Sequence, residues 1–198
     1  MSSTEVLSFS EMVLFSGNSE LYNLTSAETI EVFYKLRMDV ERLSYAALML
    51  RMMNDVCVEG ETSYQKLQLL LNSLYVLSET EKEAEFVLAV FKIRLLGILG
   101  FVPRLSKCVS CSQDVKEMKE IYFSIKDNGI KCGPCARQDK GAIQISELTY
   151  TSLLYILSAD PKKLFSFDIP KEAMQELGLV AKVYTDEKLE KEYKVELS

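Results

Sequence analysis

The chain has 198 residues, of which 48% are hydrophobic and 26% are charged, with a formal net charge of −6 and no histidine. This composition is typical of a globular protein with one substantial core. The absence of histidine excludes Ser-His-Asp and Cys-His nucleophile pairs, and also His-ligated metals. No apolar run reaches the roughly 20 residues of a membrane span, and we find no leader pattern. We therefore expect a cytoplasmic protein that does not contact a membrane.

The first 24 residues look extended. Two segments, residues 6–15 and 20–24, are expected to form strands joined by a turn near Gly17 and Asn18. A hairpin of only two strands is marginally stable in water. We therefore expect these strands to lie on the helices, or to belong to a sheet whose other strands are absent.

Helical periodicity dominates most of the remaining chain. Thr25 and Glu28 form a capping box before apolar residues at helical spacing, which predicts a first helix. The helix after Asp39 is rich in alanine and methionine; we interpret its methionines as core, with a partner-binding groove as the alternative. Four more helices are predicted. The first covers residues 62–77, and the second is a central, nearly all-apolar helix that runs from a Ser78–Glu81 capping box to Gly97 or Gly100. The third is capped by Ser146, and the last begins at Pro170 and is followed by a charged helical tail at residues 186–194.

Two Cys-x-x-Cys pairs interrupt the helical pattern. Their members are Cys108, Cys111, Cys132 and Cys135. Two such pairs at this separation are typical of a four-thiolate zinc ribbon. The segment between them reads as a β-hairpin, because Asn128-Gly129 is a favoured turn dipeptide. Two disulfides, which need an oxidising compartment, and four unrelated thiols are the alternatives.

The number of ligands indicates what the metal would do. A catalytic zinc keeps one position open for water, whereas four thiolates close the shell. We therefore expect one structural zinc ion that folds a small segment, and no enzymatic activity. A hydrolase or transferase that uses this zinc is the disfavoured alternative. Cys57 stands apart in an apolar helical run and is interpreted as a small buried hydrophobic residue.

Positive charge gathers around the cysteines. Residues 102–141 carry eight basic and five acidic side chains, a net of +3 against −9 for the rest of the chain. The acidic total argues against nucleic-acid binding by bulk electrostatics. This segment forms either a modest basic patch or a mixed, solvated surface.

Four sequence stretches resemble the bacterial RecO family of DNA repair proteins. They are residues 95–103 (LLGILGFVP) running into Cys108-Val109-Ser110-Cys111, residues 133–137 (GPCAR) followed by residues 141–143 (GAI), residues 20–28 (ELYNLTSAE) and residues 43–47 (LSYAA). The resemblance implies a non-enzymatic, nucleoid-associated recombination mediator that anneals strands and helps to load RecA. It also implies three partners: RecR, the C-terminal tail of the single-stranded-DNA-binding protein SSB, and single- and double-stranded DNA.

The resemblance also implies a layout. We expect a mainly α fold: residues 25–198 form a helical bundle with an inserted zinc ribbon at residues 108–135, and residues 1–24 are a two-stranded remnant of an OB-fold. An OB-fold has five strands, so most of it is expected to be missing. DNA contacts are then expected only from basic residues near the zinc: Arg104, Lys107, Lys131 and Arg137.

The SSB tail is acidic and ends in phenylalanine, so we expect the bundle to present an apolar pocket rimmed by Lys or Arg. The alternative function is a zinc-braced protein–protein adaptor without direct DNA binding.

Overall fold

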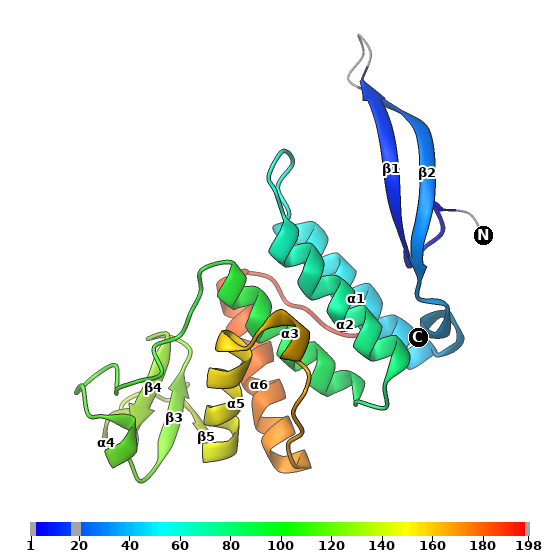
Figure 1. The fold of residues 1–198 in the computed structure, drawn as a ribbon. Coiled ribbons are helices and arrows are strands. Elements are labelled where there is room, and N and C mark those ends of the chain that lie inside the picture. The colour runs from blue at the N-terminus through cyan, green and yellow to red at the C-terminus, as the bar shows by residue number, and fades with distance from the viewer. Residues whose placement is uncertain (1–2, 17–20, 197–198) are drawn as a thin grey trace.

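The computed structural model describes residues 3–16 and 21–196. Within these residues, a two-stranded hairpin leads into a bundle of α-helices, and a small three-stranded sheet lies at the other end of the bundle (Figure 1). The expected mainly helical fold is confirmed in part: about half of the chain is helical, with six α-helices and two small antiparallel sheets among the described residues.

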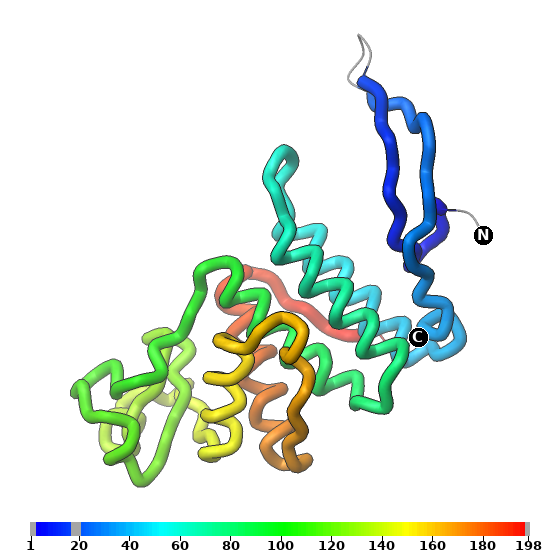
Figure 2. Tube along the Cα trace, in the orientation of Figure 1, coloured from blue at the N-terminus to red at the C-terminus, as the bar shows by residue number. Residues whose placement is uncertain are grey.

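The N-terminal hairpin projects from the bundle (Figure 2). It pairs β1 (Ser8–Ser16) with β2 (Tyr22–Val32) in antiparallel register. The two predicted strands are therefore confirmed, whereas the turn predicted at residues 17–18 lies outside the described residues. The helix predicted from the Thr25–Glu28 capping box is wrong. Both residues lie in β2, where Glu28 faces Glu11 across the ladder, so strand pairing outweighs the local capping signal.

The helical part begins with a 3-10 turn, η1 (Tyr34–Met38), and α1 (Val40–Val56). The Asp39 carboxylate accepts a hydrogen bond of 3.0 Å from the Arg42 backbone N–H and so caps α1. Met49 and Met52 are fully buried, which confirms that the methionines of α1 belong to the core. The prediction of a buried Cys57 is wrong, because α1 ends one residue earlier and Cys57 is exposed.

The next two helices are α2 (Tyr64–Glu79) and α3 (Ala84–Ile98). Ser78 is buried inside α2, so the capping box predicted for it is wrong. The predicted end of α3 is confirmed: Gly100 has φ +89°, in the left-handed region that glycine tolerates. Eleven of the fifteen residues of α3 are buried, and α3 packs against α1, α2, α5 and α6, which makes it the central helix.

The cysteine-rich segment forms the small sheet. Its elements are η2 (Val115–Glu117), β3 (Ile121–Ser124), β4 (Gly129–Cys132), the single turn α4 (Gly133–Ala136) and β5 (Ile143–Ile145). The strand order is β4-β3-β5, and both pairs are antiparallel. The predicted hairpin between the cysteine pairs is confirmed.

The chain returns to the bundle through α5 (Glu147–Ser158), η3 (Pro161–Lys163) and α6 (Lys171–Lys188). The Ser146 hydroxyl caps α5, as predicted, by accepting a hydrogen bond from the Thr149 backbone N–H. The predicted charged helical tail is wrong beyond Lys188. Tyr193 is 2% exposed and its hydroxyl donates to the Asp55 carboxylate over 3.0 Å, so the C-terminal segment lies along the bundle.

Among the described helices, none is both long enough and apolar enough to cross a bilayer.

Candidate metal centre and adjoining hollows

Two short turns bring four thiols to one point. Cys108 and Cys111 belong to the loop after α3, Cys132 ends β4 and Cys135 lies in α4. Their sulfur atoms all lie within 4.8 Å of one another, and the Sγ atoms of Cys111 and Cys132 are 3.7 Å apart. A tetrahedral shell with metal–sulfur bonds of about 2.3 Å has sulfur–sulfur edges of about 3.8 Å. The cluster can therefore hold a metal ion.

Backbone contacts fix the turn that carries Cys108 and Cys111 and the hairpin turn between β3 and β4. The Cys108 N–H donates to the Gln113 carbonyl over 2.8 Å, and the Ser112 N–H donates to the Cys108 carbonyl over 2.9 Å. In the hairpin turn, Asn128 has φ +54° as expected for this dipeptide, whereas Gly129 is required for a different reason. A Cβ atom at Gly129 would lie 2.5 Å from the Arg104 carbonyl oxygen, so only glycine lets these two backbones approach.

The thiols differ in acidity. Burial raises the pKa of Cys108, but backbone N–H groups of Cys111, Cys132 and Ser110 outweigh it and lower that pKa to about 6. The pKa of Cys135 is raised to about 12, chiefly by its hydrogen bond to Cys132 and by burial. Metal ions bind thiolates, so an ion would displace the remaining thiol protons.

Lys131 was expected to contact DNA, but its side chain is buried. Its side chain is 7% exposed and forms ion pairs with Asp127 and with Asp139, the latter over 2.9 Å. Asp139 also accepts a hydrogen bond from the Ser124 hydroxyl, and this bond and Lys131 lower its pKa. These groups form a closed ionic network that joins β3 and β4 to the loop after α4.

The other expected DNA contacts are exposed. Arg104 and Lys107 line one hollow of about 540 Å³ between residues 102–112 and the C-terminal end of α5, so the fold brings these two cations together. Arg137 lies elsewhere, at the C-terminal end of α4.

A second hollow, of about 610 Å³, is lined by α1, α3, α6 and residues 193–195. Lys92 of α3 reaches it and is 3% exposed as a residue. Burial lowers the pKa of Lys92 to about 8. Within the described part of the chain, its ammonium group has no hydrogen-bond or ion-pair partner. Sequence reasoning missed Lys92, although a lysine inside the apolar stretch of residues 86–96 was a usable signal.

The comparisons with known proteins agree with the resemblance. Residues 37–196 match the family described as "Recombination protein O C terminal". The DNA repair protein RecO of Acetivibrio thermocellus is 42% identical over 190 residues, which cover 96% of this chain and 74% of that protein. The RecO protein of Alkaliphilus metalliredigens is 34% identical over 184 residues, 93% of this chain and 74% of that protein. The chain therefore belongs to the RecO family of DNA repair proteins.

Proposed function

We propose that this chain is a non-enzymatic mediator of recombinational DNA repair, which promotes strand annealing and RecA loading together with RecR and SSB. The observation that carries the proposal is the family match over residues 37–196. A non-enzymatic role is supported by the absence of histidine from the sequence and by a thiol cluster that leaves no ligand position open. Its place of action would be the nucleoid.

The metal is proposed to be one structural zinc ion. Four soft thiolate ligands suit zinc, and zinc in such a site contributes folding free energy and not reactivity. The sheet that carries the ligands has strands of only three and four residues, so it gains from a cross-link between the loop after α3 and α4. The proposed ligands are the four cysteines named above.

The Lys92 hollow is proposed to receive the SSB tail. Leu88, Met174 and Val195 offer an apolar wall for the terminal phenylalanine ring. The unpaired Lys92 ammonium is available for the terminal carboxylate. Lys182 contributes less, because it already pairs with Asp186 over 2.9 Å.

DNA contact is proposed for the exposed cations Arg104, Lys107 and Arg137, and to a lesser extent for Lys131, whose charge is already paired with two carboxylates. We further propose that β1 and β2 are strands of an OB-fold. Exposed apolar side chains on this hairpin, such as Leu14 at 54% and Leu24 at 49%, support the assignment, because a barrel interior takes side chains of this kind. The division at residue 24 also stays a proposal, although β2 itself continues to Val32.

The adaptor function without direct DNA binding is the second candidate. The net charge of −6 and the sequestered charge of Lys131 favour it.

Fluorescence anisotropy of a labelled SSB-tail peptide, titrated at low and physiological salt, tests the proposal. Saturable binding is expected, and a peptide without its terminal phenylalanine should bind far more weakly. Absence of binding at both salt concentrations, together with no acceleration of strand annealing, would refute the mediator function. Tail binding without any DNA binding or annealing would favour the adaptor.

A further inference from the structure

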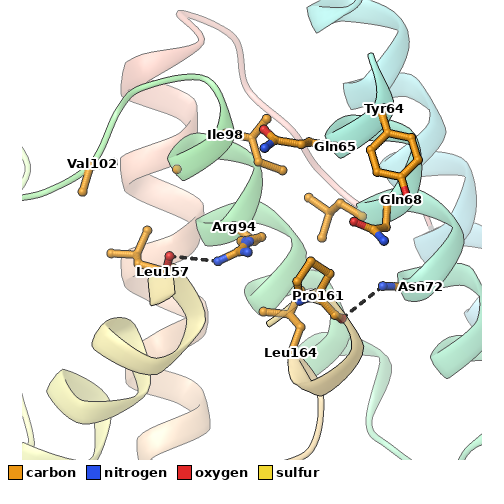
Figure 3. A pocket seen from close by; sticks show the side chains of 12 residues that line it. Tyr64, Gln65, Gln68, Asn72, Arg94, Ile98, Val102, Leu157, Pro161 and Leu164 are labelled. Atoms are coloured by element: carbon orange, nitrogen blue, oxygen red, sulfur yellow. Dashed lines mark hydrogen bonds between the residues drawn. The ribbon is translucent and has the colours of Figure 1, made fainter. Parts of the chain in front are cut away.

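A third hollow, of about 370 Å³, opens between α2, the C-terminal end of α3, α5 and η3 (Figure 3). One wall is a stripe of amide side chains: Gln65, Gln68 and Asn72 project from α2 toward Ile98 and Pro161. Apart from Arg94, the opposite wall and floor are apolar. An apolar hollow with a few polar groups at fixed positions is typical of a small-ligand site.

The polar groups differ in how far they are already engaged. Asn72 donates to the Pro161 carbonyl over 3.1 Å. Among the described residues, the side-chain amides of Gln65 and Gln68 have no hydrogen-bond partner. Each amide offers both donors and an acceptor. Gln65 is exposed and Gln68 is half-buried, so both amides, which are free of partners from the described residues, are open to a ligand. Their donors and acceptors match a planar ligand with a mixed hydrogen-bonding edge.

Arg94 adds a fixed positive charge to the floor. Its guanidinium donates to the carbonyls of Ile156, Leu157 and Ala159 at 2.8–3.0 Å, and so caps α5. These bonds hold the guanidinium plane in place between α3 and α5 (Figure 3). Tyr64 stands at the rim and is 69% exposed as a residue. A fixed guanidinium and an exposed aromatic ring are both surfaces on which a base can stack.

This hollow adjoins the one that holds Arg104 and Lys107, because Val102 and Leu157 line both. Neither hollow is lined by any carboxylate from the described part of the chain. The chain has 29 acidic residues among 198, so a carboxylate-free path along two adjoining hollows stands out against the acidic remainder. Such a path, with cations along it, is what a phosphate backbone requires.

We propose that the two hollows form one binding site for single-stranded DNA, in which Gln65 and Gln68 receive an unstacked base and Arg104 and Lys107 contact the adjoining phosphates. The inference rests on the proposed function for DNA contact and adds to it a base-accepting site on the helical bundle. A duplex cannot present a splayed base, so the site selects single strands.

The test compares a labelled oligothymidylate with a strand of equal length made of abasic units. Wild-type protein is expected to bind the thymidine strand about tenfold more tightly. Gln65→Leu/Gln68→Leu should remove this preference and leave the affinity for the abasic strand unchanged. Gln144→Leu, an exposed glutamine on β5, is the matched control and should keep the preference.

A charge series tests the phosphate contacts. Arg104→Gln/Lys107→Gln should weaken binding of both strands equally and reduce the salt slope of log affinity by about 1.4, the value for two contacts on a single strand. Lys116→Gln/Lys119→Gln, two exposed lysines of the small sheet segment, should change the slope far less.

Three results would overturn the inference. Equal wild-type affinity for the two strands would leave DNA contact in place but remove the base site. Binding of neither strand would remove both the base site and direct DNA contact, and tail-peptide titration of the same sample shows whether the rest of the proposed function survives. A glutamine double variant that loses tail-peptide affinity while keeping base preference would identify the hollow as a peptide site.

Discussion

Replacing Lys92 with methionine should stabilise the protein. Lys92 is buried without a partner, and its pKa of about 8 against 10.5 for an ordinary lysine measures how much the folded state disfavours the ammonium form. The difference corresponds to about 3 kcal/mol at 1.36 kcal/mol per pKa unit. Methionine keeps the apolar stem and removes the charge, so Lys92→Met should raise the free energy of unfolding by up to about 3 kcal/mol near pH 7.

The gain should depend on pH in a defined direction. A lysine with a lowered folded pKa makes the unfolded state bind more protons between pH 8 and 10.5, so wild-type stability rises across this window. The difference between variant and wild type should therefore be greatest below about pH 8 and shrink to about 1 kcal/mol near pH 9.5. Urea denaturation at several pH values measures it, with Lys119→Met, an exposed lysine, as the control. A gain that does not change with pH, or no gain at neutral pH, would refute this reasoning.

Three further changes probe the rest of the molecule. Cys108→Ser or Cys135→Ser should abolish binding of one metal equivalent and unfold the small sheet while far-UV circular dichroism keeps the helical signal; loss of all helix would contradict a local role. Asp139→Asn should lower the free energy of unfolding by about 2 kcal/mol, less than the loss of a whole buried ion pair, because Lys131 keeps its pair with Asp127. Wild-type stability should fall as the pH drops below 3.8 through the lowered pKa of Asp139, and the variant should lose less stability over this range. Urea denaturation at several acidic pH values measures both effects. Arg94→Met should cost about 3 kcal/mol in urea denaturation, since three carbonyls at the end of α5 lose their donor, and a cost below about 0.5 kcal/mol would show that water replaces it.

Local sequence signals predicted an element correctly where its tertiary contacts favour the same structure. The cysteine spacing and the Asn-Gly dipeptide predict the small sheet, and Ser146 does cap α5. The Thr25–Glu28 capping box failed because nine β1 residues pair with β2, which no local pattern at Thr25 reports. The Ser78–Glu81 box failed because Ser78 packs inside α2. Strand pairing in the first case, and continuation of a buried helix in the second, outweigh a cap that stabilises by about 1 kcal/mol.

The charged groups were harder to place than the apolar ones. The sequence suggests that Lys131 is a surface cation, yet Asp127 from the hairpin turn and Asp139 from the loop after α4 both pair with it. Tyr193 lies in a run of charged residues, yet Asp55, 138 positions away, accepts its hydroxyl hydrogen bond. Such partners meet only after the chain has folded. The helical tail predicted at residues 186–194 could therefore be corrected beyond Lys188 only by long-range geometry. The DNA contact predicted at Lys131 stays a proposal, and its two ion pairs make it less favourable.

The central helix separates the two proposed sites. Lys92 and Arg94 are two residues apart on α3, and at about 100° per residue they point to nearly opposite sides. One side meets the tail hollow and the other meets the base hollow, so both anionic ligands should bind at once. A saturating unlabelled tail peptide should leave the anisotropy titration of a labelled oligothymidylate unchanged. Lys92→Met should weaken tail binding, and Gln65→Leu/Gln68→Leu should reduce base preference. When the three substitutions are combined in one protein, each loss should equal the loss measured separately. Competition between peptide and strand would show that the two hollows serve a single ligand. In that case α3 would not separate two sites, and its apolar faces would serve only to pack the bundle.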